Sequence, residues 1–166
     1  VNDSEITIDQ AGSSNSADAL QTLGNGNMLI DIDQQGSDNV ADVTQQYGQW
    51  HEAQIEQTGS NNDVSLIQDN TSTLANVSQD GAGNSADIYQ RNYRFAFGTF
   101  SSRVDVGQIG DNNEAFVSSD GFGNNVSVVQ GSETRASDGQ FASVMQNGSD
   151  NQATIEQLGR GNADHT

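Results

Sequence analysis

A pattern of five positions recurs along this 166-residue chain and limits its possible folds more than any other feature. It reads Gln-x-Gly-x-x-Asn-x-(Ala/Val)-x-x-x-Gln, and its first copy is formed by Gln10, Gly12, Asn15, Ala17 and Gln21. Copies return roughly every 22 residues, a period typical of solenoid proteins. In such proteins one unit cannot bury its apolar face alone, and stacking of units does so.

Within each unit the apolar residues lie two positions apart, as in Asn84, Ala86, Ile88 and Gln90. Alternate side chains of a β-strand share one face, whereas a helix would need apolar residues three and four apart. The pattern therefore predicts strands with an inward face of Asn, small apolar, larger apolar and Gln. The intervening positions, expected to face outward, carry the acidic residues Asp18, Asp42, Glu56, Asp87, Glu114 and Glu156.

We predict an all-β fold, a β-solenoid of two-strand rungs of about 22 residues each, whose consecutive rungs stack in parallel and in register. Residues 1–166 would form a single domain of this kind. The repeat spacing slips at about 91–107 and 131–139, so both ranges are expected to be inserted loops. The first holds aromatic and Arg residues, which could pack on the solenoid or contact other fibres or polysaccharide.

In such a stack, equivalent amides lie above one another, and each can donate a hydrogen bond to the next rung. This arrangement explains how polar residues can face inward, since an isolated buried amide would cost about 1–3 kcal/mol. The predicted stacking ladder comprises Gln10, Asn15, Gln21, Gln34, Asn39, Gln45, Gln57, Asn62, Gln68, Gln79, Asn84, Gln90, Gln108, Asn113, Asn124, Gln130, Gln146, Asn151 and Gln157. At one position of the pattern Ser119 replaces Gln.

Each Gly of the pattern is expected at a corner of the rung, where a positive φ or a close backbone approach is needed. These turn glycines are Gly12, Gly36, Gly59, Gly81, Gly110, Gly121 and Gly148.

The composition excludes several functions. With 23 acidic against 5 basic residues the net charge is −18, which argues against binding nucleic acid or an anionic membrane. The chain has no Cys and no apolar run near the ~20 residues of a membrane-spanning helix. We expect no enzyme, cofactor or metal site, and interpret His51 as a turn residue. The chain begins with Val1 rather than Met, as expected after a processed or engineered junction.

Together with Ser4 in its first copy, the pattern resembles the curlin repeat of bacterial curli subunits, and the resemblance covers nearly all of the chain outside the two insertions. It implies a secreted, extracellular subunit of a cell-surface amyloid fibre in a biofilm matrix. It also implies partners: other copies of the chain, a nucleator subunit, a secretion pore and matrix polysaccharide. A major subunit is favoured over a nucleator.

The chain has no Pro and no segment with a capping-helix pattern, although soluble proteins usually shield exposed strand edges. We therefore expect the last rung of one copy to pair with the first rung of the next, head to tail, which makes an open fibre. One alternative is a monomeric β-solenoid binding module such as a surface adhesin, and another is a disordered acidic matrix protein.

Overall fold

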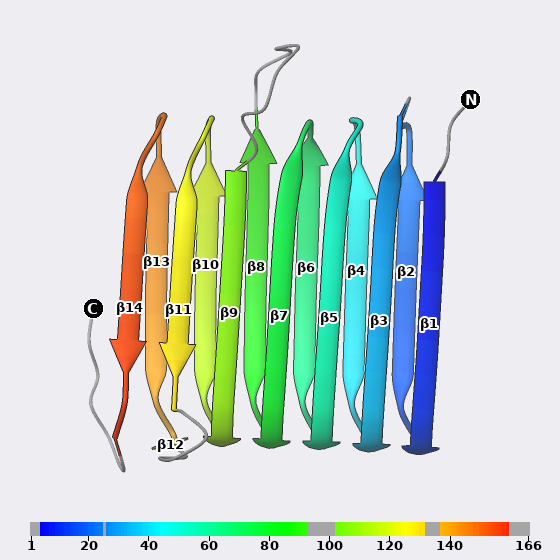
Figure 1. The fold of residues 1–166 in the computed structure, drawn as a ribbon, viewed down its shortest axis with the longest axis vertical. Coiled ribbons are helices and arrows are strands. Elements are labelled where there is room, and N and C mark those ends of the chain that lie inside the picture. The colour runs from blue at the N-terminus through cyan, green and yellow to red at the C-terminus, as the bar shows by residue number, and fades with distance from the viewer. Residues whose placement is uncertain (1–3, 25, 93–101, 132–136, 160–166) are drawn as a thin grey trace.

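The computed structural model describes residues 4–24, 26–92, 102–131 and 137–159, and over these ranges the chain consists of strands and short connections. The strands form two facing layers, with β1 at one end of the stack and β14 at the other (Figure 1). We call the layers the front sheet and the back sheet, after the view of Figure 1. Successive strands alternate between them, which is the path of a β-solenoid.

The front sheet contains seven strands in the order β1-β3-β5-β7-β9-β11-β14. Their bounds are β1 Ser4–Ser13, β3 Met28–Ser37, β5 His51–Ser60, β7 Thr73–Ala82, β9 Ser102–Asp111, β11 Asn125–Gln130 and β14 Gln152–Gln157. The short strand β12 (Ser137–Asp138) pairs with the end of β9.

The back sheet contains six strands in the order β2-β4-β6-β8-β10-β13. Their bounds are β2 Ser16–Thr22, β4 Val40–Gln46, β6 Asp63–Asn70, β8 Ser85–Asn92, β10 Glu114–Asp120 and β13 Phe141–Asn147. Lower arcs lead from the front sheet to the back sheet, and upper arcs lead to the next front strand (Figure 1).

Neighbouring strands of both sheets pair in parallel and place equivalent residues side by side. In the front sheet Gln10 aligns with Gln34, and Gln34 with Gln57. In the back sheet Ala17 aligns with Ala41, and Ala41 with Val64. The predicted all-β solenoid with parallel, in-register stacking is confirmed.

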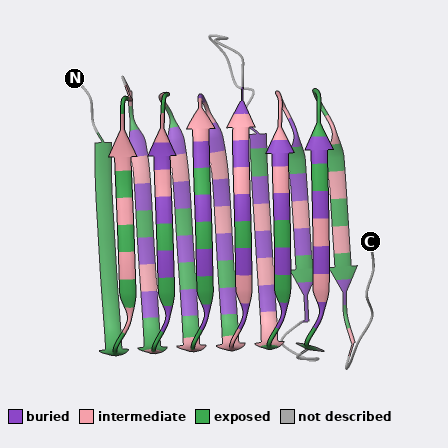
Figure 2. Ribbon diagram, turned by 180° about the vertical axis from the view of Figure 1, so that it is seen from behind, coloured by how far each residue is buried: buried purple, intermediate pink, exposed green. Residues whose placement is uncertain are grey.

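The two sheets enclose a thin core made by alternate residues of each strand. Ile32, Val43, Leu66 and Val104 are all fully buried, whereas their immediate neighbours along each strand are partly or fully exposed. The alternation appears as purple bands between pink and green in Figure 2. Core residues contact their equivalents above and below, so the core continues along the whole stack.

Strand boundaries narrow the ranges expected as loops. Arg91 and Asn92 end β8, and 102–107 lie in β9, so only 93–101 separate these strands, and they lie outside the described residues. The repeat spacing predicted too wide a loop, because the alternation of buried and exposed residues continues on both sides of the insertion, through Asn92 and from Ser102 onward. Of the second range, 132–136 lie outside the described residues and 137–138 form β12.

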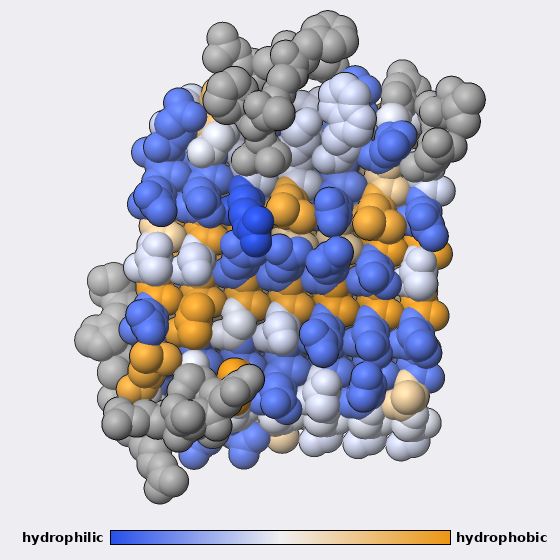
Figure 3. Space-filling model, in the orientation of Figure 1, coloured by the Kyte–Doolittle hydropathy of each residue, from blue (hydrophilic) through white to orange (hydrophobic). Residues whose placement is uncertain are grey.

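The outer face of the front sheet is organised in bands that cross the strands, because equivalent positions stack (Figure 3). The acidic residues expected to face outward are exposed: Asp18, Asp42, Glu56, Asp87, Glu114 and Glu156.

Candidate functional site

A continuous column of Gln side chains runs through the interior along the front sheet. Each Gln donates from Nε2 to Oε1 of its equivalent on the following front strand, over 2.5 to 2.9 Å. The interior members are at most 1 % exposed. This column, the front ladder, consists of Gln10, Gln34, Gln57, Gln79, Gln108, Gln130 and Gln157.

The second amide hydrogen of these side chains ties the two sheets together. Gln34 Nε2 donates to the carbonyl of Ser16, 3.0 Å away, and Gln57 Nε2 donates to that of Val40, 2.9 Å away. Both acceptors belong to the back sheet. Each buried amide nitrogen therefore makes one bond along the stack and one across it, which satisfies a group that is costly to bury unpaired.

The back sheet carries a second column of Gln residues, and it is interrupted. Gln21, Gln45, Gln68 and Gln90 follow one another with Nε2–Oε1 distances of 2.9 to 3.2 Å. The next position is Ser119, which aligns with Gln90 on one side and Gln146 on the other. Ser119 Oγ and Gln146 Oε1 are buried with no partner among the described residues, so the short side chain breaks this ladder.

Asn side chains stack in the lower arcs and donate in the opposite direction. The backbone N–H of Asn39 donates to Asn15 Oδ1 over 3.1 Å, and Asn62 donates to Asn39 in the same way. Asn84 and Asn113 continue the series. In each of these bonds the later residue is the donor.

Two further Asn residues stack in the upper arcs, where Asn151 donates to Asn124 Oδ1 from both its backbone and its side chain, over 3.1 Å. Gln140, which was not among the predicted ladder residues, takes the Asn position after Asn113 and donates its N–H to Asn113 Oδ1 over 3.3 Å. The spacing of Gln140, Ala142 and Gln146 could have revealed it, since it repeats the half-unit with Gln in place of Asn.

The seven glycines of the pattern lie at the arcs with φ between 109° and 135°: Gly12, Gly36, Gly59, Gly81, Gly110, Gly121 and Gly148. At Gly36 the next rung comes so close that an added Cβ would lie 1.9 Å from the carbonyl oxygen of Gly59. Only a residue without a side chain allows this approach together with such a φ.

The interpretation of His51 as a turn residue is wrong. His51 is the first residue of β5, is 1 % exposed, and stacks between Met28 and Thr73, with Nδ1 2.7 Å from Thr73 Oγ1. Burial lowers the pKa of His51 to about 4, although the carbonyls of Asn70 and Gln46 favour the charged form. The turn residue is its neighbour Trp50, which has a φ of 60° and is half exposed.

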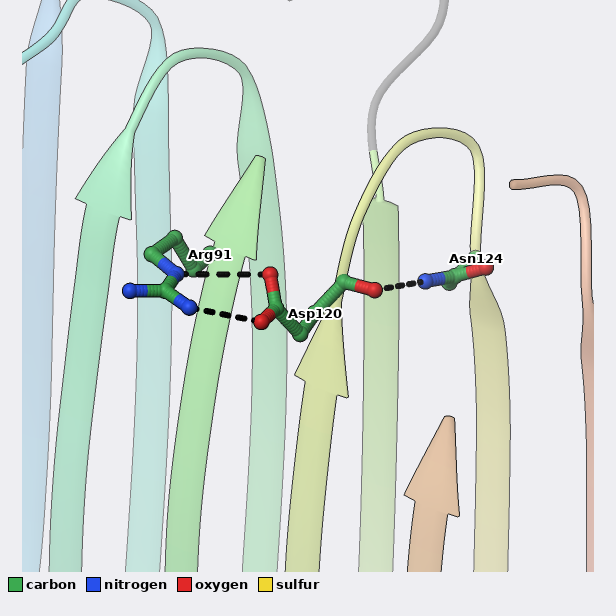
Figure 4. Close-up of polar contacts among 3 residues, drawn as sticks. All are labelled: Arg91, Asp120 and Asn124. Carbon is green, nitrogen blue, oxygen red and sulfur yellow. Dashed lines mark hydrogen bonds and ion pairs between the residues drawn. The ribbon is translucent and has the colours of Figure 1, made fainter. Parts of the chain in front are cut away.

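Two of the Arg residues expected in the first loop belong to strands. Arg91 on β8 forms a bidentate ion pair with Asp120 on β10, whose backbone carbonyl accepts a bond from Asn124 (Figure 4). Arg103 on β9 pairs with Asp105 over 2.5 Å. Tyr93, Arg94, Phe95, Phe97 and Phe100 lie outside the described residues.

The stack is open at both ends of its described part. Strand β1 pairs only with β3, and strand β14 pairs only with β11. Ile6 and Ile8 of β1 are 44 % and 42 % exposed, although their equivalents Ile30 and Ile32 are fully buried. The β1 end of the described part therefore presents unpaired backbone groups, apolar side chains and the exposed ladder amide of Gln10 together, a surface complementary to another rung.

These features define a repeat protein in which the buried amide side chains find their hydrogen-bond partners in the equivalent positions of neighbouring rungs. A model of the curlin associated repeat matches residues 2–30, 44–69, 101–131 and 138–163. The chain therefore belongs to the curlin-repeat family, whose members are extracellular curli subunits with a structural rather than an enzymatic role. A search of curated proteins found no match.

The part of the chain that the structure describes contains no cluster of His and acidic side chains suited to a metal ion. It also contains no helix of the length and hydropathy needed to span a membrane.

Proposed function

We propose that this chain is a secreted, extracellular structural subunit that self-assembles head to tail into curli-like amyloid fibres of a biofilm matrix. The observation that carries the proposal is the pair of complementary open ends formed by β1 and β14. A second copy can continue the backbone pairing of the front sheet at these ends. A nucleator, a secretion pore and matrix polysaccharide are further proposed partners.

The polarity of the front ladder favours head-to-tail contact. Its donors point toward β14, so the outermost acceptor at the β1 end is Gln10 Oε1, on an exposed side chain, whereas Gln157 at the β14 end is buried and donates to the carbonyl of Phe141 over 2.9 Å. The Asn series of the lower arcs runs the opposite way. A head-to-head contact would set Gln10 Oε1 of one copy against the same acceptor of the other, whereas a head-to-tail contact keeps the donors of the front ladder pointing in one direction through both copies.

The register within the front sheet specifies the junction. Gln residues align on every pair of front strands, so Gln157 of one copy would lie over Gln10 of the next. The same register places Ile155 over Ile8 and Thr154 over Thr7. Burial of the exposed Ile6 and Ile8 side chains would add a few kcal/mol to the contact.

Because both ends repeat the same inward pattern, each added copy recreates the end to which it attached. Growth of this kind has no built-in limit, which supports a major subunit over a nucleator. A monomeric binding module such as an adhesin would need capped ends, and β1 and β14 each pair on one side only within the described residues.

A disulfide test can detect this junction, since the chain has no Cys. The double variant Thr7→Cys/Thr154→Cys changes two exposed, outward residues. Neighbouring strands lie about 4.8 Å apart, within the range for a disulfide between Cα atoms. We expect filaments by electron microscopy and, after oxidation, covalent multimers on a non-reducing gel.

The control is Thr7→Cys/Ser65→Cys, in which the second substitution lies outward on β6 of the back sheet, away from the junction. This variant should give filaments without the ladder of covalent multimers. Absence of filaments, or equal cross-linking in both variants, would reject the head-to-tail assembly.

A further inference from the structure

One outward row of the front sheet has an uneven distribution of charge along the stack. Its first three members, on β1, β3 and β5, are the carboxylates Asp9, Asp33 and Glu56. The row continues through Ser78, Gly107 and Val129, which are uncharged, and ends with Glu156 on β14. Acidic residues thus occupy both ends of this row, and its middle is neutral.

The proposed junction brings the two ends together. With Gln157 over Gln10, Glu156 of one copy lies directly over Asp9 of the next, in line with Asp33 and Glu56. Four carboxylates then follow one another at the spacing of neighbouring strands, about 4.8 Å. This run forms only when two copies meet, because within one copy Glu156 lies beside Val129.

No basic side chain of the neighbouring strands offsets this charge. Asp9 faces Asp33 and the diagonal Asp31, and Gln35 donates a bond to Asp33 over 3.4 Å. Strands β1, β3, β11 and β14 contain no Lys, Arg or His. Arg103, on β9, is already paired with Asp105.

Resting on the proposed head-to-tail assembly, we infer that the Glu156–Asp9 contact is an electrostatic gate on subunit addition. Like charges at this spacing in water change an equilibrium constant by roughly fourfold per pair, and salt screens them. The contact opposes addition at neutral pH and low salt. Protonation of either carboxylate, or added salt, removes the opposition.

The test measures the critical concentration, which is the protein that stays soluble beside mature fibres, in low salt at about pH 7 and about pH 4. Glu156→Gln and Asp9→Asn should each lower it about threefold to tenfold at neutral pH, because each removes the repulsion at the junction. The wild-type value should fall toward theirs on acidification or addition of salt.

Glu114→Gln is the matched control, since it removes the same charge from an exposed site on β10 of the back sheet. The change in critical concentration caused by Glu114→Gln measures the effect of the lower net charge alone. The double variant Asp9→Asn/Glu156→Gln tests the contact itself: the second substitution should add little to the first, because the repulsion is already gone. Circular dichroism of the soluble variants verifies that each retains its β-structure.

Equal critical concentrations for Glu156→Gln and Glu114→Gln would overturn the inference, as would full additivity in the double variant. If the Thr7→Cys/Thr154→Cys variant still forms covalent multimers in that case, the head-to-tail assembly stands and only the gate is rejected. If the wild-type chain forms no filaments, both proposals fail.

Discussion

The interior of this solenoid depends on single amide side chains that bond in two directions. In the Gln column of the back sheet, Ser119 stands where the pattern has Gln, so one amide is missing. Beside it, the buried Gln146 Oε1 has no hydrogen-bond partner among the described residues. The spacing of Ser119 in the sequence shows that it replaces Gln at this position of the pattern. Its consequence could not be predicted from the sequence, because the pattern does not show whether a neighbour moves to fill the gap.

Ser119→Gln should repair this ladder and stabilise the monomer by about 1 kcal/mol, the typical net value of a buried hydrogen bond. The backbone already aligns residue 119 with Gln90 and Gln146, so the new side chain can adopt the conformation of its neighbours. Urea denaturation of freshly prepared monomer measures the change. Ser118→Gln, at an outward position, should leave the stability nearly unchanged; lower stability of the position-119 variant would show that the gap has closed.

The buried His51 makes the stability of the fold depend on pH. Its folded-state pKa of about 4 lies below the ordinary value of 6.5, so between these values the unfolded chain binds more protons. Stability should therefore fall as the pH drops from about 6.5 to 4, by up to about 3 kcal/mol, and change no further below that from this residue.

His51→Thr removes this pH dependence. It introduces the residue type that the next rung has at the same position, Thr73. The difference in unfolding free energy between the variant and the wild type should grow on acidification, which isolates His51 from the many carboxylates that titrate in the same range. Parallel pH profiles for the two proteins would contradict the prediction.

At the scale of strands and arcs, most of the architecture follows from the sequence, because alternate residues of each strand repeat the same types. Ala86, Ile88 and Gln90 face inward as their spacing predicts. The interpretation failed for His51, since the unit there differs from the Asn pattern and its strand begins one residue after Trp50. No repeat position predicted β12, because this strand is defined by its pairing with the end of β9 and not by a unit of the repeat.

The arcs set a strict steric limit that a strand interior does not. Gly36→Ala should destabilise the monomer by more than about 2 kcal/mol, because its Cβ would overlap the carbonyl of Gly59 at a φ of 118°. Gly107, within β9, is the matched control: no atom lies within 4 Å of an added Cβ. Gly107→Ala should be neutral or stabilise by up to about 1 kcal/mol. Thermal unfolding of both variants decides this, and equal losses would contradict it.

At the scale of the whole molecule, a solenoid behaves as a one-dimensional stack in which each rung is held mainly by its neighbours. A central strand such as β5 pairs on both sides, whereas β1 and β14 pair on one side only in the described residues. Local opening should therefore be easiest at the ends. Head-to-tail assembly would give these end strands the second neighbour that the central strands already have.

Hydrogen exchange of backbone amides, measured in the monomer and in fibres, tests whether the end strands open most easily and whether assembly protects them. In the monomer, amides of β1 and β14 should exchange faster than those of β5, because opening an end rung breaks contacts with only one neighbour. In fibres all three strands should be protected to a similar degree. Strong protection of β1 in the monomer would show that its edge is already covered, and fast exchange of β1 in fibres would show that copies join through another surface.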